Sequence, residues 1–206
     1  WNEQRLYCEI LKNSQRYAQK GRMETGYSYK VPNQWQGNYK NLKVIGDKQG
    51  GASTVRIGKS PQIVDLLFKV IQKQIKFIHV TRNPYDNISS IFKRDGKRLG
   101  LDFQGCIDHY FSHCGTIANF KQQIKEKDFY DLKHEDIIQN PKIQLKELCD
   151  FLGQETSEDY LEDCASIIFD SPNKSRSRYD WDKDMIQLVE SQIQHFSFLE
   201  GYSYEN

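Results

Sequence analysis

The sequence has no long hydrophobic run, no marked excess of charge of either sign and no regular spacing of cysteines. No apolar stretch approaches the roughly 20 residues that a membrane-spanning helix needs, so no membrane segment is predicted. The net charge of +1 over 206 residues excludes a globally basic nucleic-acid-binding protein, but it is compatible with a local basic pocket. We therefore expect no nucleic-acid partner.

The cysteines are odd in number and irregularly placed. The five are Cys8, Cys106, Cys114, Cys149 and Cys164. This pattern favours reduced thiols over a disulfide framework, and hence a cytoplasmic location. Because the chain begins at Trp1 rather than at methionine, we also expect it to be part of a longer sequence, in which a signal or an anchor can come first.

The chain is long enough for one domain, residues 1–206, with a real core, and 13% aromatic residues argue against disorder. Apolar periodicity predicts strands over 42–46 and 76–81, a strand with its exit loop over 129–136, and a loop after the first strand. Helices are predicted over 2–20, 84–94, 103–125, 141–152 and 182–199, and another opens at Ser60–Pro61. Strands that alternate with helices imply a parallel sheet covered by helices, which binds ligands at the carboxyl ends of its strands.

Arg82 stands at such a strand end, in the stretch "KFIHVTRNPYDNISSIFKR" (76–94). Asn83 and Pro84 are good N-cap and first-turn residues, so a helix with its anion-attracting amides should begin just after the arginine. Ser90 lies two turns further on, on the face of the helix start. A guanidinium and a hydroxyl on one side suit a phosphate, whereas the simpler interpretation is that Arg82 only pairs with Asp86.

The segment "VTRNPYDNISSIF" resembles the 3′-phosphate-binding segment of the sulfotransferases that use 3′-phosphoadenosine 5′-phosphosulfate (PAPS). In that family a strand ends in Arg-Asn/Asp-Pro-x-Asp, and a serine follows eight residues after the arginine. The resemblance implies that Arg82 and Ser90 bind the 3′-phosphate of the donor, whose product is 3′,5′-adenosine bisphosphate (PAP). It also implies a three-layer α/β fold, a parallel sheet flanked by helices like that of the P-loop NTPases.

Two later stretches are similar to the same family. "LKHEDIIQNPKIQLKELCDFLG" (132–153) resembles its later strand, loop and helix, and "NKSRSRYDW" with the closing "LEGY" resembles its C-terminal part. In such sequences the basic loop closes over the nucleotide, so the resemblance implies donor-binding roles for four residues of this loop: Lys174, Arg176, Arg178 and Tyr179. A solvated basic loop is the alternative.

The phosphate loop that holds the 5′-phosphosulfate in this family has no counterpart in the sequence. "RIGKSP" (56–61) would need glycine at position 53, which is Ser53, and Lys59–Ser60–Pro61 is better explained as a helix cap. We expect the missing strand and loop to precede Trp1. A chain that truly began there would bind the nucleotide weakly and transfer nothing.

The candidates for catalysis are Lys48, Asp47 and His109. "VIGDKQGG" (44–51) looks like the family's Glu/Asp-Lys segment, in which Lys48 would face the sulfuryl oxygens or an acidic acceptor and Asp47 would fix it or act as base. A solvated loop pair is the alternative.

Because an imidazole ordinarily titrates near neutrality, His109 and His113 are candidates to deprotonate an acceptor hydroxyl. The spacing of Cys106, His109 and His113 puts them on one face of a helix, and zinc accepts such ligands. This spacing is more commonly that of an ordinary amphipathic helix, so no metal is expected.

The sequence thus predicts a PAPS-dependent sulfotransferase that moves a sulfuryl group to a hydroxyl or amine of an acceptor of unknown class. Two alternatives stay open: a degenerate nucleotide-binding or interaction domain without catalysis, and a P-loop kinase that acts on small molecules.

Overall fold

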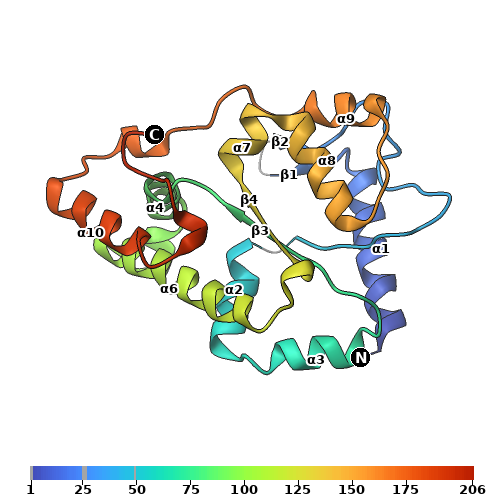
Figure 1. The fold of residues 1–206 in the computed structure, drawn as a ribbon, viewed down its shortest axis with the longest axis horizontal. Helices are drawn as coiled ribbons and strands as arrows, with labels where there is room; N and C mark the ends of the chain where they lie inside the picture. Colours follow the sequence, from blue (N-terminus) through green and yellow to red (C-terminus); the bar gives the residue numbers. More distant parts are fainter. Residues whose placement is uncertain (1, 25–26, 49) are drawn as a thin grey trace.

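The computed structural model describes residues 2–24, 27–48 and 50–206. Its helices and strands follow one another as α1 (Glu3–Gln19), β1 (Met23–Glu24), β2 (Tyr27–Ser28), α2 (Gly50–Lys59), α3 (Ile63–Val70), β3 (Phe77–Thr81), α4 (Pro84–Ile91), α5 (Lys97–Leu99), α6 (Phe103–Gln122), β4 (Phe129–Lys133), α7 (His134–Gln139), α8 (Pro141–Leu152), α9 (Glu158–Ala165) and α10 (Lys183–Ile193) (Figure 1). A π-helical turn (Phe92–Gly96) continues α4, and a 3₁₀ turn (Ser175–Arg178) lies between α9 and α10.

The parallel strands β3 and β4 cross the middle of the molecule (Figure 1). Their register runs from Phe77 opposite Phe129 to Thr81 opposite Lys133. Parallel neighbours need a crossover connection, which α4 to α6 provide. The predicted α/β class with parallel strands is confirmed, and the parallel sheet has two strands in the part of the chain described above.

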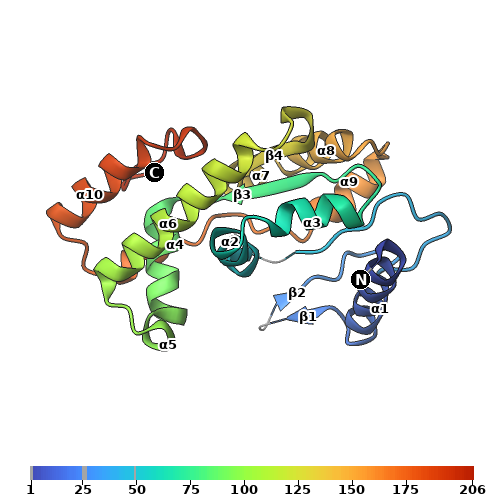
Figure 2. The same ribbon diagram turned by 90° about the horizontal axis from the view of Figure 1, so that it is seen from below.

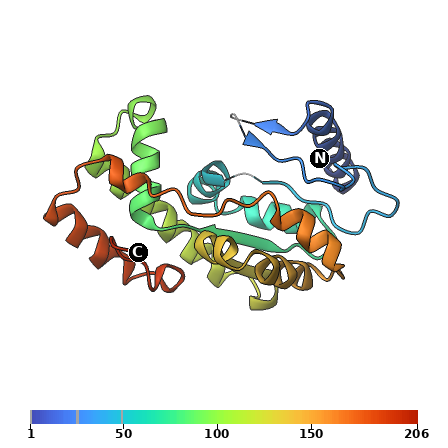
Figure 3. The same cartoon turned by 90° about the horizontal axis from the view of Figure 1, so that it is seen from above.

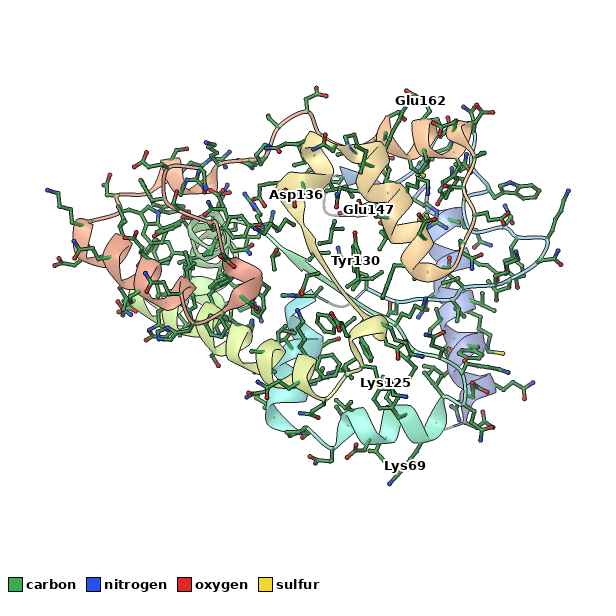
Figure 4. All side chains as sticks on the ribbon, viewed as in Figure 1. Lys69, Lys125, Tyr130, Asp136, Glu147 and Glu162 are labelled. Atoms are coloured by element: carbon green, nitrogen blue, oxygen red, sulfur yellow. The ribbon has the colours of Figure 1, made fainter. Side chains whose placement is uncertain are left out.

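Helices pack on both faces of this strand pair, although one face is only partly covered, since Ile78 and Val80 are 43% and 56% exposed. Phe77 on one face contacts Phe68 of α3 and Phe120 of α6, with ring centroids 6.3 and 4.9 Å away. Tyr130 points to the other face, since side chains alternate along a strand, and its ring lies 5.1 Å from Phe151 of α8. Figure 2 shows α3 and α8 on opposite sides of β3. The Tyr130 hydroxyl also donates to Glu147 of α8 at 3.3 Å (Figure 4).

The main core lies between α4, α6 and α10. It is built around side chains that are almost fully buried: Tyr85, Ile88, Ile107, Val189 and Leu199. Burying one large apolar side chain contributes about 1.5–3 kcal/mol, so this cluster fixes α4 firmly. Helix α4, which follows Arg82 and carries Ser90, is therefore firmly anchored in the core.

The sequence around residue 50 was predicted wrongly. Residues 42–46 are not a strand: Leu42 and Val44 are more than two fifths exposed, and no strand of the described chain pairs with them. The predicted loop that follows is largely helix α2, which packs on α6. Glycines allow this close approach, because a β-carbon added at Gly58 would lie 3.0 Å from Oγ1 of Thr116.

Most other boundaries agree with prediction to within a few residues, and α8 agrees at both ends. Helix α3 begins at Ile63, later than the expected cap at Ser60, whose carbonyl accepts the Ile63 amide.

All five cysteines are free, and Cys106 and Cys114 are buried. In the ranges given above, no helix is both long and apolar enough to cross a membrane.

Candidate functional site

The turn between β3 and α4 places a cation at the end of a parallel strand. Arg82 follows the last strand residue, and Asn83 caps the helix by accepting the Tyr85 amide on its side-chain oxygen at 3.1 Å. Pro84 takes the first helical position, where a missing N–H costs nothing. The predicted helix start is confirmed.

Arg82 and Ser90 meet at one residue of the loop between α9 and α10. Nη2 of Arg82 lies 3.4 Å from Oγ of Ser175, and Oγ of Ser90 lies 3.2 Å from the same oxygen. Arg82 also donates to the carbonyl of Asn173. Figure 3 shows this loop running from α9 across the molecule to α4. The guanidinium and the two hydroxyls therefore face one point beside α4.

Two buried nitrogens near this point are unsatisfied. Nε of Arg82 and Nδ1 of His134 have no hydrogen-bond partner among the residues that the structure describes. Burial lowers the pKa of His134, and the charge of Arg82 adds to this effect, although the neighbouring carboxylates of Glu135 and Asp86 oppose it. A buried donor without a partner costs about 1–3 kcal/mol, so the Nε–H of Arg82 is available for an acceptor.

Asp86 binds Arg176 rather than Arg82. Its two carboxylate oxygens accept the Arg176 amide and Nη1, each at 2.9 Å, and both side chains are almost completely buried. Arg176 also donates to the carbonyl of Asn206. The nearest nitrogen of Arg82 is 3.9 Å from Asp86, too far for a hydrogen bond. The simpler interpretation, in which Arg82 only pairs with Asp86, is thus not the main interaction of either group.

The aromatic residues of the loop anchor it to the helices. Tyr179 packs edge-on against Phe92 of the π-helical turn, 5.5 Å between centroids, and also meets Phe103 at 6.1 Å. Trp181 donates through Nε1 to Ser89 at 3.3 Å. This packing explains why the loop stays on α4.

Lys174 and Arg178 are exposed residues of the same loop. Nη2 of Arg178 donates to the side-chain oxygen of Asn173 at 3.2 Å. The four predicted loop residues therefore differ in their surroundings. Arg176 is buried and paired with Asp86, and the ring of Tyr179 packs against Phe92. Lys174 and Arg178 are exposed cations.

The segment of Lys48 and Asp47 leads into α2. Both residues are exposed, and Nζ of Lys48 lies 5.9 Å from the centre of the Tyr29 ring. A β-carbon added at Gly51 would lie 3.6 Å from Cε1 of His113 on α6. The start of α2 thus lies beside His113. Among the described residues, the hydrogen-bond and ion-pair partners of Arg82 do not include Lys48, Asp47 or His109.

His109 and His113 are direct neighbours on α6, with ring centroids 4.2 Å apart. Cys106 is instead fully buried in the core. Within the described ranges, no three histidine, cysteine, aspartate or glutamate side chains gather so as to hold a metal ion.

His113 should make the stability of the protein depend on pH. Burial, assisted by His109, lowers the pKa of His113 from its usual 6.5, so the folded protein favours the neutral ring. The unfolded chain then binds more protons as the pH falls through about 6.5, and the stabilisation present above that pH is lost. We expect the free energy of unfolding in urea to fall less steeply between pH 7.5 and 5.5 in His113→Gln than in the wild type. Parallel curves for the two proteins would contradict this.

The stretch "RIGKSP" lies at the end of α2, not at the start of a helix. Gly58 and Lys59 are its last residues, and the Ser60 amide donates back to Arg56. A phosphate loop needs free amides at a helix N-terminus, whereas a helix C-terminus carries carbonyls and partial negative charge. This stretch is therefore no phosphate loop.

Sequence reasoning missed Ser175 and Glu135 as contacts of the turn and of α4. Serine and arginine alternate in residues 175–178, so hydroxyls and cations are interleaved there. The local sequence does not indicate which of these side chains faces α4. Glu135 stood within a stretch already singled out, yet its partner, the Asn83 amide, is 52 residues away.

Residues 6–158 match the model of a family described as "Sulfotransferase family". A comparison with curated protein sequences finds no match.

Three solved structures are similar to the chain. The sulfotransferase domain from the curacin biosynthetic pathway is 19% identical, with 67% of this chain and 59% of that chain covered and a TM-score of 0.49. The sulfotransferase domain from the Synechococcus PCC 7002 olefin synthase is 23% identical, with 66% of this chain and 55% of that chain covered and a TM-score of 0.42. Mouse sulfotransferase SULT7A1 complexed with PAP is 20% identical, with 58% of this chain and 45% of that chain covered and a TM-score of 0.40. The chain thus spans less than two thirds of the length of each. On the family match, which covers well over half of its residues, the chain belongs to the sulfotransferase family.

Proposed function

We propose that this chain holds the 3′-phosphate end of PAPS in a sulfotransferase that moves a sulfuryl group, by in-line transfer, to a hydroxyl or amine acceptor. The observation that carries the proposal is the meeting of Arg82 and Ser90 at Ser175. Arg82 follows the carboxyl end of the parallel strand β3 and precedes the start of α4, and such folds bind phosphates at places of this kind.

The donors at this point fit a phosphate group. Among the described residues, the Nε–H of Arg82 has no hydrogen-bond partner, and Ser90 and Ser175 each offer a hydroxyl. The planar fork of a guanidinium can bind two phosphate oxygens at once, and hydroxyls can take the third. A phosphate here would replace the present contacts of Arg82 with the loop, namely those with Asn173 and Ser175.

The loop residues contribute in different ways. Lys174 and Arg178 are exposed cations that can reach an approaching nucleotide. Arg176 acts through Asp86 by fixing the loop, and Tyr179 acts by packing against Phe92. We assign the last two to holding the donor site in shape.

The reacting end lies toward Lys48, Asp47 and His109 in this proposal. PAPS supplies an activated sulfuryl group when it is bound. Lys48 would stabilise the negative charge that spreads over the sulfuryl oxygens, and Asp47 or His109 would accept the proton of the acceptor. The step places no demand on a metal ion.

A comparison of nucleotides by thermal unfolding tests the proposal. PAP at about 100 times its dissociation constant should stabilise the protein by about 2.7 kcal/mol, which raises Tm by about 5–10 °C. Adenosine 5′-monophosphate, which lacks the 3′-phosphate, should raise Tm much less at the same concentration. Equal shifts for both nucleotides, or no shift with PAP, would overturn the assignment.

The same experiment separates the other function classes. A larger shift with ATP and Mg²⁺ than with PAP would favour a kinase. A shift with PAP but no label transfer from radioactive PAPS to any acceptor of a hydroxyl and amine panel would favour a nucleotide-binding module without catalysis.

A further inference from the structure

Glu135 joins three segments of the chain at the turn that carries Arg82. It lies in the first turn of α7, directly after β4. Its Oε1 accepts the backbone N–H of Asn83 at 3.0 Å, and its Oε2 accepts the hydroxyl of Tyr202 at 2.6 Å. One carboxylate therefore binds the β3–α4 turn with one oxygen and the segment after α10 with the other.

The N–H that Glu135 accepts belongs to the peptide between Arg82 and Asn83. A hydrogen bond to a carboxylate is a strong one, and it fixes the plane of that peptide. The side chain of Arg82 starts from the α-carbon next to this plane. Its guanidinium contacts Ser175, which Ser90 also contacts, so a rotation of the plane would move the guanidinium away from this point.

The turn is held on its other side by the C-terminal segment. Nδ2 of Asn83 donates to the carbonyls of Ser203 and Asn206, each at 2.9 Å. Tyr202, which binds Glu135, belongs to the same segment, and burial together with Glu135 raises the pKa of its hydroxyl, which stays protonated and donating. The carboxylate of Glu135 is thus itself held in place, and its bond to the Asn83 amide holds the turn in place.

We propose that Glu135 is a positioning residue for the 3′-phosphate of the donor, acting through Arg82 rather than by touching the nucleotide. This rests on the proposed function. It predicts that loss of the carboxylate harms recognition of the 3′-phosphate and leaves the rest of nucleotide binding intact.

The test measures the affinity for PAP and for adenosine 5′-monophosphate by calorimetry in the same proteins. Glu135→Ala should weaken PAP binding about tenfold, the equivalent of one charged hydrogen bond, and should change adenosine 5′-monophosphate binding less than about twofold. Glu135→Gln keeps an oxygen for the Asn83 amide and should stay within about threefold of wild type for PAP. Asp136→Ala, which removes the neighbouring exposed carboxylate, is the matched control.

A double-mutant cycle shows whether Glu135 acts through Arg82. In an Arg82→Ala background, Glu135→Ala should cause no further loss of PAP affinity, whereas independent effects would add. If Glu135→Ala does not fold, Tyr202→Phe in both backgrounds serves the same cycle. Full additivity, or equal losses for PAP and adenosine 5′-monophosphate, would overturn the inference. If wild type itself does not prefer PAP, the proposed function fails instead.

Discussion

Arg82→Ala is expected to weaken the binding of PAP by about 1.5–3 kcal/mol, which is about one to two powers of ten in affinity. The guanidinium contacts Ser175 beside Ser90, and its Nε–H has no partner in the part of the chain that the structure describes. The substitution takes away the guanidinium that contacts Ser175 beside Ser90 at the end of β3. Titration calorimetry with PAP measures the loss.

This substitution should leave the protein folded. Both oxygens of Asp86 already accept bonds from Arg176, so the loss of Arg82 leaves no buried carboxylate without a cation. Arg98→Ala is a suitable control, because Arg98 is exposed and pairs on the surface with Asp95. Unchanged PAP affinity in Arg82→Ala, with a Tm close to that of Arg98→Ala, would refute the phosphate-binding role.

Arg176→Met is expected to cost about 3–5 kcal/mol of unfolding free energy, since it removes the cation that is hydrogen-bonded to the buried carboxylate of Asp86. The side chains of Arg176 and Asp86 are 5% and 2% exposed, so water cannot replace the lost partner. A cost of this size is a large part of the stability of a typical domain. Urea unfolding at pH 7 is the measurement.

The same loop provides the control. Arg178→Met changes an exposed arginine two residues away and should alter stability by no more than about 0.5 kcal/mol. The double variant Asp86→Asn/Arg176→Met should be less destabilised than the sum of its single variants, because it removes both charges together. Equal stabilities of Arg176→Met and Arg178→Met would show that the buried pair does not hold the loop.

Local signals predicted well those parts of the fold that local interactions determine. Asn83 and Pro84 marked the start of α4, and Pro141 and Gly153 marked α8, because caps and turn residues act within a few positions of themselves. The same is true of Arg82 and Ser90, whose common face follows from helical periodicity alone.

Features that depend on distant partners could not be read in this way. Helix α2 contains Gly51 and Gly58, which disfavour an isolated helix, and it is supported by close packing on α6. Arg176 looked like an available cation, and only the fold shows that Asp86, 90 residues earlier, binds it. The apolar residues of 42–46 suited a strand, but a strand also needs a neighbour with which to pair.

The bonds of Asn83 also bear on the order in which the molecule assembles. Its side chain is held by carbonyls 120 and 123 residues further along the chain. Closing so long a loop is entropically costly, and contacts between such distant residues form slowly. During synthesis on the ribosome, the turn at Arg82 therefore cannot gain these two contacts before residues 203–206 emerge, so its final geometry is reached long after its own residues are made.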